Sequence, residues 1–364
     1  MLRKTILLKI LILGVFTSSF IFALTKITEP KINQFVDKMV KEHSFDSADL
    51  KKLLLNTTYQ EQVIAAIQKP AEKLPWYKYE RIFLTDNRVN AGVKFWQENE
   101  ETLNRATNTY GVPQEIIVSL IGVETFYGKI KGSYPVLDSL VSLSFYYPPR
   151  AKFFTSELEH FLLYAREENK DPRSFRGSYA GAMGYPQFIS SSIRNFAVDF
   201  SNDGYRDLHD NVVDAIGSVG NFINKHGWIN GEPIVLKTTF KGPVPEALMP
   251  LLNSIQQPTL TAPELKVYGI TPPNKISDKL PASVFSFELD DKPTIEYWLG
   301  FNNFYTITRY NRSQNYALAV YLLSEKIKVA YAKTKQASNT TKATNTISKN
   351  TGKGKPNTKA KAKT

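Results

Sequence analysis

The sequence predicts an α+β protein in which a mainly helical lobe precedes a small strand-rich lobe. Apolar residues recur at helical spacing through most of the chain up to Trp228. Beyond Trp228 the pattern changes to short β-branched and aromatic segments, several of them separated by proline-rich turns. Of the 364 residues, 42% are hydrophobic and 12% are aromatic, which is enough for a sizeable core.

Apolar spacing and stop residues place the elements of the helical lobe, residues 25–232. We expect helices within 28–73 and at 89–110, 113–127, 136–146, 150–168, 190–199 and 211–226. Gly111 and Gly128 are predicted to end two of them, because glycine tolerates the left-handed conformation found after a helix. Residues 75–86 are predicted to be an aromatic connection, and residues 176–188 a Gly/Ser-rich loop.

The second lobe is predicted from runs of strand-forming residues over 233–310. The expected strands are 233–240, 265–270, 283–290, 295–301 and 304–311. A final helix at 316–332, within a segment 311–332, is expected to return to the first lobe. Residues 333–364 are rich in Lys, Thr, Asn and Ala, and this composition predicts a disordered tail.

The first 24 residues have the composition of an export signal. Arg3, Lys4 and Lys9 precede an apolar run without acidic residues, which predicts a periplasmic protein. The cleavage pattern around Phe22 and Ala23 is poor, so retention as an inner-membrane anchor stays open as an alternative. Because the chain has no cysteine, neither a lipoprotein nor a disulfide scaffold is expected.

The net charge of +12 comes from the two ends of the chain. The predicted signal and the lysine-rich tail carry the excess, and the body between them is close to neutral. We therefore expect no nucleic-acid site on the folded body. We also expect a monomer. The tail could contact an anionic membrane or cell-wall surface, and a solubilising tail without a partner is the alternative.

The stretch GVETFYGKIKG, residues 122–132, sets one glutamate in an apolar run. Glu124 follows Ile117, Leu120 and Ile121 at spacings of three and four, so it shares their helix face. Burial would raise the pKa of this carboxyl and favour its protonated form. A protonated carboxyl in a cleft can act as a general acid on a glycosidic bond. The alternative is a solvated glutamate paired with Lys129 or Lys131.

The stretch DFSNDGYRDLHD, residues 199–210, begins like an EF-hand loop. Asp199, Ser201 and Asp203 stand at positions 1, 3 and 5, and glycine stands at position 6. Position 12 is Asp210 instead of the usual glutamate. Serine at position 3 removes a charge, so a modest affinity for Ca²⁺ or Na⁺ is expected. An Asx-rich turn without an ion is the alternative.

Several long motifs in the same order resemble the lytic murein transglycosylase B family over residues 75–330. They are YGVPQEIIVSLIGVETFYG (110–128), LDSLVSLSFYYPPRAKFF (137–154), ELEHFLLYAREE (157–168), GSYAGAMGYPQF (177–188), DFSNDGYRDL (199–208), DAIGSVGNFINKHGW (214–228) and TRYNRSQNYALAV (308–320). The resemblance implies a lysozyme-like helical catalytic lobe. It also implies cleavage of the β-1,4 bond between N-acetylmuramic acid and N-acetylglucosamine in peptidoglycan glycan strands, with a 1,6-anhydromuramyl product and no required cofactor.

The resemblance assigns roles residue by residue. The family's single catalytic acid and base falls on Glu124. Substrate-positioning residues of the family fall on Ser178, Gln187, Tyr310, Asn311 and Arg150. Tyr185 lies among aromatic residues in the same motifs that could stack on sugar rings, although core packing would also explain them.

In the family the metal loop closes after position 12, at the residue that is Asp214 here. The ligands implied for the loop 199–214 are Asp199, Ser201, Asp203, the backbone carbonyl of Tyr205, and Asp214. We expect the ion to brace the loop and to take no part in the chemistry.

Three other functions remain open from the sequence. One is a muramidase that uses water, one is a peptidoglycan-binding scaffold without turnover, and one is a calcium-gated interaction module. The mass of the product released from purified peptidoglycan distinguishes the two enzymes, since an anhydro product lacks one water.

Overall fold

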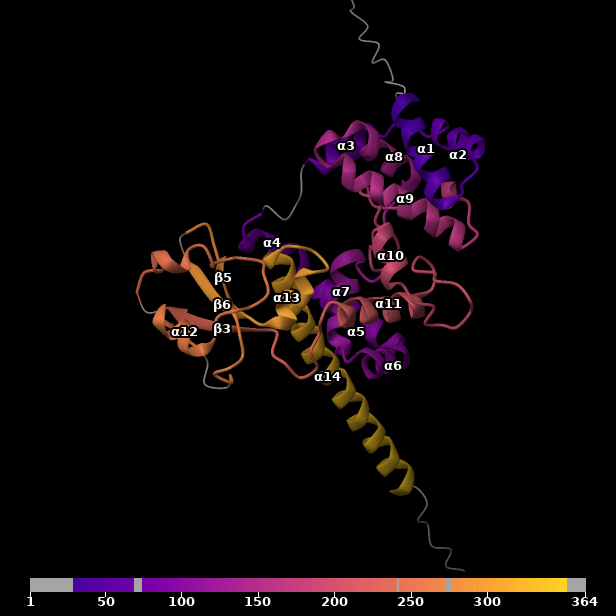
Figure 1. The fold of residues 1–364 in the computed structure, drawn as a ribbon. Coiled ribbons are helices and arrows are strands. Elements are labelled where there is room, and N and C mark those ends of the chain that lie inside the picture. The colour runs from indigo at the N-terminus through magenta and orange to yellow at the C-terminus, as the bar shows by residue number, and fades with distance from the viewer. Residues whose placement is uncertain (1–28, 69–73, 241, 273–275, 293, 352–364) are drawn as a thin grey trace, which may run out of the picture. The chain divides into compact units, whose positions relative to one another are not determined.

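The computed structural model describes residues 29–68, 74–240, 242–272, 276–292 and 294–351 (Figure 1). The chain divides into two compact units after Tyr59. The predicted export segment, residues 1–24, lies outside the described residues. Within the described part of the chain, no helix combines the length and the apolar character needed to span a bilayer.

The first unit contains two helices, α1 (Glu29–His43) and α2 (Ser47–Leu55), which contact each other. Asp46 begins α2, and its side chain accepts a hydrogen bond from the Asp49 amide at 2.8 Å. This N-cap satisfies one of the amides that the first turn of a helix leaves without a partner. The expected helical character of this segment is therefore confirmed.

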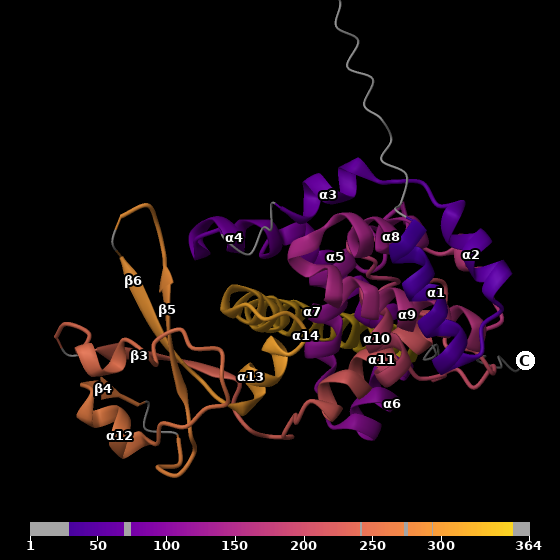
Figure 2. The ribbon, with the colours of Figure 1, turned by 45° about the horizontal axis from the view of Figure 1, so that its top comes forward.

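The second unit contains most of the helices and the sheet. Its first helices are α3 (Glu61–Ile67), α4 (Trp76–Phe83), α5 (Asp86–Glu98), α6 (Glu100–Tyr110), α7 (Gln114–Thr125), α8 (Val136–Tyr146), α9 (Ala151–Glu167), α10 (Ser190–Phe196) and α11 (Val212–Lys225). Helix α7 contacts α5, α6, α11 and the last helix, α14 (Gln314–Thr351) (Figure 2). It is the central helix of the unit.

Two expectations for the helical lobe were wrong. Residues 75–86 are not a connection, because they contain α4, whose Trp76 and Tyr79 are buried. The single helix expected at 89–110 is two helices that meet at Asn99. The Asn99 side chain donates to the Phe95 carbonyl at 2.8 Å, and this bond caps the end of α5. Gly111 ends α6 as predicted, with a φ of 72°.

The strand-rich lobe forms one antiparallel sheet in the order β4–β3–β6–β5. Its strands are β3 (Val235–Phe240), β4 (Ile270–Thr271), β5 (Ser283–Glu288) and β6 (Ile295–Gly300). Leu299 on β6 pairs with Leu236 on one side and Val284 on the other. Val284 and Leu299 are buried in a small core with Leu248. The predicted α+β class is therefore confirmed.

Two predicted strands are partly or mostly helical. Residues 265–267 lie in α12 (Ala262–Val267), which begins at a capping box made by Thr261 and Glu264, and of the predicted strand 265–270 only Ile270 lies in a strand, at the start of β4. Residues 304–311 lie mostly in α13 (Asn302–Thr308). Phe304 and Ile307 are both buried there, and their spacing of three also suits a helix. The pattern of a short apolar run does not by itself distinguish a helix from a strand.

Helix α14 is longer than the sequence suggested. It begins at Gln314 and runs to Thr351, so the tail expected to be disordered from residue 333 is helical up to residue 351. The segment contains no glycine or proline before Gly352, and its alanines and lysines are good helix formers. Residues 352–364 lie outside the described part.

Candidate active site

Helix α7 carries Glu124 in its last turn. Ile117, Leu120 and Ile121 are completely buried, as the predicted apolar face requires. The burial is not one-sided, because Val118 and other residues on the opposite side are buried as well. Glu124 itself is half-buried. The helix therefore holds the Glu124 carboxyl at the edge of the buried apolar core, where it is only partly exposed.

The end of α7 lies two residues before the predicted stop. Phe126 and Tyr127 both have positive φ values, of 51° and 60°, so the helix ends at Thr125 and Gly128 follows the turn. The Thr125 hydroxyl accepts a hydrogen bond from the Gly128 amide at 2.9 Å and donates to the Tyr185 carbonyl at 3.0 Å. The residue after Glu124 thus ties the helix end to the Gly/Ser-rich loop.

Tyr316 of α14 contacts the carboxyl directly. Its hydroxyl donates to Oε1 of Glu124 at 2.6 Å, and its side chain is only 2% exposed. Burial, followed by the nearby charge of Glu124, raises the pKa of Tyr316 well above its usual value. The phenol therefore stays a neutral donor over the physiological pH range. Sequence reasoning missed this residue, although it lies in the quoted motif 308–320.

Tyr310 stands beside Tyr316. The two rings stack with centroids 6.3 Å apart and planes 17° apart. The Tyr310 hydroxyl donates to the Pro186 carbonyl at 2.6 Å, so the turn between α13 and α14 is joined to the Gly/Ser-rich loop. Burial and the charge of Glu124 raise the pKa of Tyr310 also. Asn311 follows at the same turn, where its carbonyl accepts from the Ser313 amide at 2.7 Å.

Ser178 and Gln187 stand near the two ends of the Gly/Ser-rich loop. The Ser178 Oγ accepts from the Ala182 amide at 3.1 Å, which leaves the hydroxyl proton for another acceptor. The Gln187 amide group donates to the carbonyls of Lys131 and Gly184, at 3.0 and 2.9 Å. Both residues therefore shape the loop as well as being candidates for substrate contact.

A short ribbon joins this loop to the segment that follows α7. Strand β1 (Tyr134–Pro135) pairs with β2 (Arg176–Gly177). A Cβ at Gly132 would lie 2.2 Å from the Gly177 carbonyl, so only glycine permits this approach. Half-buried Tyr185 packs its ring against Gly128, where a Cβ would lie 2.1 Å from the ring.

Arg150 lies apart from the loop and the turn that carry the other predicted substrate-positioning residues. It is exposed at the end of the 3-10 turn Pro148–Arg150, before α9. Its guanidinium lies over the rings of Phe153 and Phe154, 4.3 and 5.1 Å from their centroids. Its described neighbours are thus residues of the next helical turn.

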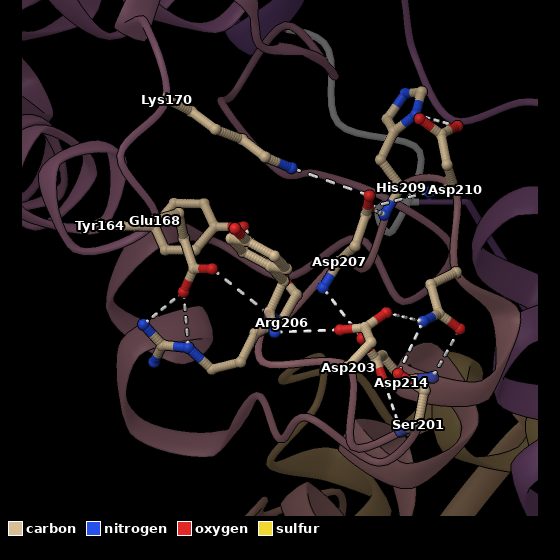
Figure 3. A network of polar contacts seen from close by, with 12 residues as sticks. Tyr164, Glu168, Lys170, Ser201, Asp203, Arg206, Asp207, His209, Asp210 and Asp214 are labelled. Carbon is tan, nitrogen blue, oxygen red and sulfur yellow. Dashed lines mark hydrogen bonds and ion pairs between the residues drawn. The ribbon is translucent and has the colours of Figure 1, made fainter.

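The predicted metal loop gathers three carboxylates. One oxygen from each of Asp199, Asp203 and Asp214 lies within 4.8 Å of the others. Figure 3 shows Asp203 and Asp214 beside Ser201. The Ser201 hydroxyl donates to Asp199 at 3.3 Å, and the exposed Tyr205 donates its amide to Asp203 at 3.0 Å. A set of oxygen donors is what Ca²⁺ prefers, so these residues fit the predicted ion.

Asp214, and not Asp210, closes this cluster. Asp214 is fully buried in the first turn of α11, and one of its oxygens accepts the amides of Phe200 and Ser201 at 2.9 and 2.8 Å. The other accepts the Asp207 amide at 3.0 Å. Burial raises the pKa of Asp214, and the hydrogen bonds oppose that rise. Asp210 is exposed and pairs with His209 at 2.9 Å.

Arg206 anchors the loop to α9, and sequence reasoning did not identify it. Its Nη2 lies 2.7 Å from Glu168 (Figure 3). The same nitrogen lies 3.1 Å from Glu167. Glu168 is only 7% exposed, so a hydrogen-bonded cationic partner is needed to hold its charge there. The loop is therefore fixed from two sides, by Asp214 of α11 and by the acidic end of α9.

Comparison with known proteins identifies the family. A family model described as the transglycosylase SLT domain matches residues 28–325. The chain is 42% identical over 311 residues to membrane-bound lytic murein transglycosylase B of Escherichia coli strain K12, and the match covers 83% of each protein.

Two solved structures agree with this match. Soluble lytic transglycosylase SltB1 of Pseudomonas aeruginosa is 44% identical, with a TM-score of 0.77 over 83% of this chain and 100% of that one. The E. coli lytic transglycosylase Slt35, solved in complex with calcium, is 41% identical, with a TM-score of 0.75 over 83% and 94% of the chains. The resemblance seen in the motifs is confirmed: the chain belongs to the family of SLT-domain transglycosylases.

Proposed function

We propose that this protein is a lytic transglycosylase that cleaves the β-1,4 bond between N-acetylmuramic acid and N-acetylglucosamine in peptidoglycan. One observation carries the assignment of the acid. Glu124 ends a buried helix, and one of its oxygens is held by a buried tyrosine. A carboxyl in this setting is only partly hydrated and has a fixed orientation. These are the properties that a general acid requires.

The proposed reaction uses one carboxyl twice. Glu124 gives its proton to the bridging oxygen as the C1–O bond of the muramyl residue breaks. The carboxylate then takes the proton of the C6 hydroxyl, whose oxygen bonds to C1 and closes the 1,6-anhydro ring. No water is consumed, and the enzyme regains its starting protonation state. Tyr316 stabilises the carboxylate between the two steps, because a phenol that donates to a carboxylate favours the ionised form.

The second carboxylate of a paired glycosidase is not needed in this scheme. The acids of the adjoining loop have other partners in the structure. Asp214 accepts three backbone amides, and Asp210 pairs with His209 and with Lys131. We infer a single-carboxyl mechanism in which the 2-acetamido group of the substrate assists at C1.

The remaining site residues are proposed to position the sugar. Ser178 and Gln187 present polar groups from the loop, and Tyr310 and Asn311 present them from the turn before α14. Tyr185 offers a half-buried ring for stacking. Arg150 is proposed to meet a substrate carboxylate outside the Glu124 group.

The mass of the released product tests the reaction. The full-length enzyme is incubated with purified peptidoglycan, and the muropeptides are analysed by mass spectrometry. The expected product is lighter than a hydrolytic one by one water. A hydrated product would favour a muramidase, and no release at any enzyme concentration would favour a binding scaffold. Glu124→Gln is the control that excludes a contaminating enzyme.

We propose that the loop 199–214 binds Ca²⁺ with a structural role. Asp199, Ser201, Asp203, the Tyr205 carbonyl and Asp214 would hold the ion, and Slt35 was solved with calcium. Thermal melts in Ca²⁺, Na⁺ or EGTA test this. Calcium should raise the Tm by several degrees over EGTA, since an ion that binds only the folded state stabilises it. Equal Tm values in all three would contradict a bound ion.

The protein is proposed to act in the periplasm on glycan strands. The N-terminal composition supports export, and the E. coli relative is named as membrane-bound. The more distant SltB3 of Pseudomonas aeruginosa, 26% identical with a TM-score of 0.71, was solved with NAG-NAM-pentapeptide. The lysine-rich end is proposed to lie along an anionic envelope surface.

A further inference from the structure

A cavity lies beside the Gly/Ser-rich loop, and the proposed reaction does not use it. It encloses about 330 Å³ between the end of α9, the β2 segment and the loop that carries the carboxylate cluster. This volume is within the range of pockets that hold small molecules. The residues that line it come from positions 164–210, which all belong to the second unit.

The lining carries charges of both signs. Lys170 and Arg176 supply cations, and Asp207 and Asp210 supply anions. Figure 3 shows Lys170, Asp207 and Asp210. The Lys170 ammonium lies 3.7 Å from Asp207, beyond hydrogen-bond distance, and the two side chains are 41% and 26% exposed. A loose pair of this kind has donors and acceptors left for a ligand. The Arg176 guanidinium is held at the rim by the carbonyls of Arg173 and Phe175.

The rest of the lining is apolar, and Phe175, Met183 and Leu208 are part of it. A simple anion in the cavity would face two aspartates, and a simple cation would face Lys170 and an arginine. A zwitterion satisfies both sets of charges, and an aliphatic chain between its charged ends would cover the apolar wall. The lining therefore selects an amino-acid-like ligand with a methylene chain.

The cavity is structurally joined to the candidate active site. The Leu208 carbonyl accepts the Tyr185 amide at 2.8 Å. A Cβ at Gly184 would lie 2.2 Å from that carbonyl, so the two segments are in close contact. Met183 lines the cavity, and two residues further on Tyr185 accepts the hydrogen bond of Thr125. The loop thus has the cavity on one side and the neighbour of Glu124 on the other.

We propose that this cavity binds the zwitterionic diamino-acid end of a short peptide, as carried by the stem peptides of peptidoglycan. Lys170 and Arg176 hold the carboxylate, and Asp207 and Asp210 hold the ammonium group. The source of the peptide, as a stem on the glycan strand or as a released peptide, rests on the proposed function. Binding of the peptide does not.

Binding is measured by calorimetry with the full-length protein and a stem tripeptide that ends in meso-diaminopimelate. Lys170→Gln and Asp207→Asn should each weaken binding by at least about tenfold, which is typical for loss of one charged hydrogen-bond partner. Asp207→Asn keeps the oxygen that accepts the amides of His209 and Asp210. Arg173→Gln is the matched control, because Arg173 is an exposed arginine paired with Asp171 outside the cavity. Circular dichroism checks the fold of each variant.

The proposal is overturned if the wild type does not bind the tripeptide at millimolar concentration, or if both cavity variants bind it as the wild type does. A tripeptide with its carboxylates amidated and both of its amines acetylated should not bind. Equal binding of this neutral peptide would also overturn the proposal, because it would show that the charges play no part.

Turnover then separates the two sources of the peptide. If Lys170→Gln slows cleavage of stem-bearing peptidoglycan and not of stem-free glycan strands, the ligand is the attached stem. If it slows neither, the ligand is a released peptide. If the wild type cleaves neither substrate, the proposed function is contradicted. The binding measurement would still show whether the cavity binds the tripeptide.

Discussion

Glu124 and Asp214 are both carboxylates on helices that contact each other, and their surroundings differ in kind. Asp214 lies in the first turn of α11 and accepts three backbone amides, so its negative charge is well solvated by the protein. Glu124 lies in the last turn of α7, where the helix dipole disfavours a negative charge, and it accepts a hydrogen bond from a phenol.

The comparison shows how position along a helix separates the two roles. At the N-terminal end of α11, backbone amides hold the Asp214 side chain in place, which suits a structural brace or a cation ligand. At the C-terminal end of α7, the half-buried Glu124 carboxyl is held by a side-chain donor from another helix, which suits a group that exchanges its proton with a substrate. Three predictions test this contrast, from the largest effect to the smallest, and a fourth concerns a histidine outside it.

Glu124→Gln should abolish turnover and leave the fold intact. We expect a loss of about 10³-fold or more in the rate of muropeptide release, which is in the range of general acid–base catalysis. The amide can still accept the Tyr316 hydrogen bond, so the Tm should change little. The measurement pairs release from purified peptidoglycan with a thermal melt. Substantial residual turnover would show that another group is the acid.

Asp214→Ala should have the opposite profile, with lost stability as its primary effect. Three buried amides would lose their acceptor, which costs on the order of 3 kcal/mol. The Tm should fall by roughly 5–10 °C, and the activity of the protein that remains folded should be near that of the wild type. Asp210→Ala is the matched control, since this side chain is 79% exposed, and it should melt like the wild type.

Tyr316→Phe tests the contact that orients the acid. We expect roughly a tenfold loss in turnover, because the carboxylate left by proton transfer loses one donor. The alkaline limb of the pH–rate profile should also move to higher pH, since the lost phenol favoured the ionised form of Glu124. An unchanged profile would mean that Tyr316 only fills space.

His226 provides the smallest test, away from both carboxylates. Burial lowers its pKa from 6.5, although a hydrogen bond to the Phe222 carbonyl opposes this shift. The unfolded chain therefore binds a proton near pH 6.5 that the folded protein does not. Stability from this group is complete above pH 6.5 and falls as the pH drops below it.

His226→Phe should remove that part of the pH dependence. Comparing urea unfolding at pH 7.5 and pH 5.5, we expect the variant to lose less stability than the wild type by up to roughly 1 kcal/mol. A variant that loses as much as the wild type would assign the acid sensitivity to other groups.

Much of the fold was predicted correctly, because the apolar spacing of the long helices extends over several turns. Helices such as 136–146 and 211–226 were placed within a residue of their ends in α8 and α11. The strands at 265–270 and 304–311 were wrong, because short apolar runs fit both periods and tertiary packing decides between them. The split of 89–110 at Asn99 depended on a side-chain cap that composition does not reveal.

Some residues of the candidate site were also predictable from the sequence, and others were not. Motifs located Glu124, Ser178, Gln187 and Tyr310, and their roles remain predictions. Tyr316 was missed because a tyrosine in an apolar helix has the sequence signature of a core residue, and its hydroxyl meets Glu124 across 192 positions of the chain. Arg206 was missed because its partners, Glu168 and Glu167 at the end of α9, lie 38 and 39 positions away in the chain.

By itself, the sequence determined the order and type of most elements, the family, and which carboxyl stands in an apolar run. These properties are local, since they depend on spacing along the chain and on turn residues. Only the tertiary structure decided which donors meet each carboxyl, that α7 is buried nearly all round, and that a charged cavity lies behind the loop beside Glu124. Hydrogen-bond partners and enclosed volume arise from contacts between distant segments, and a single sequence does not encode those in its periodicity.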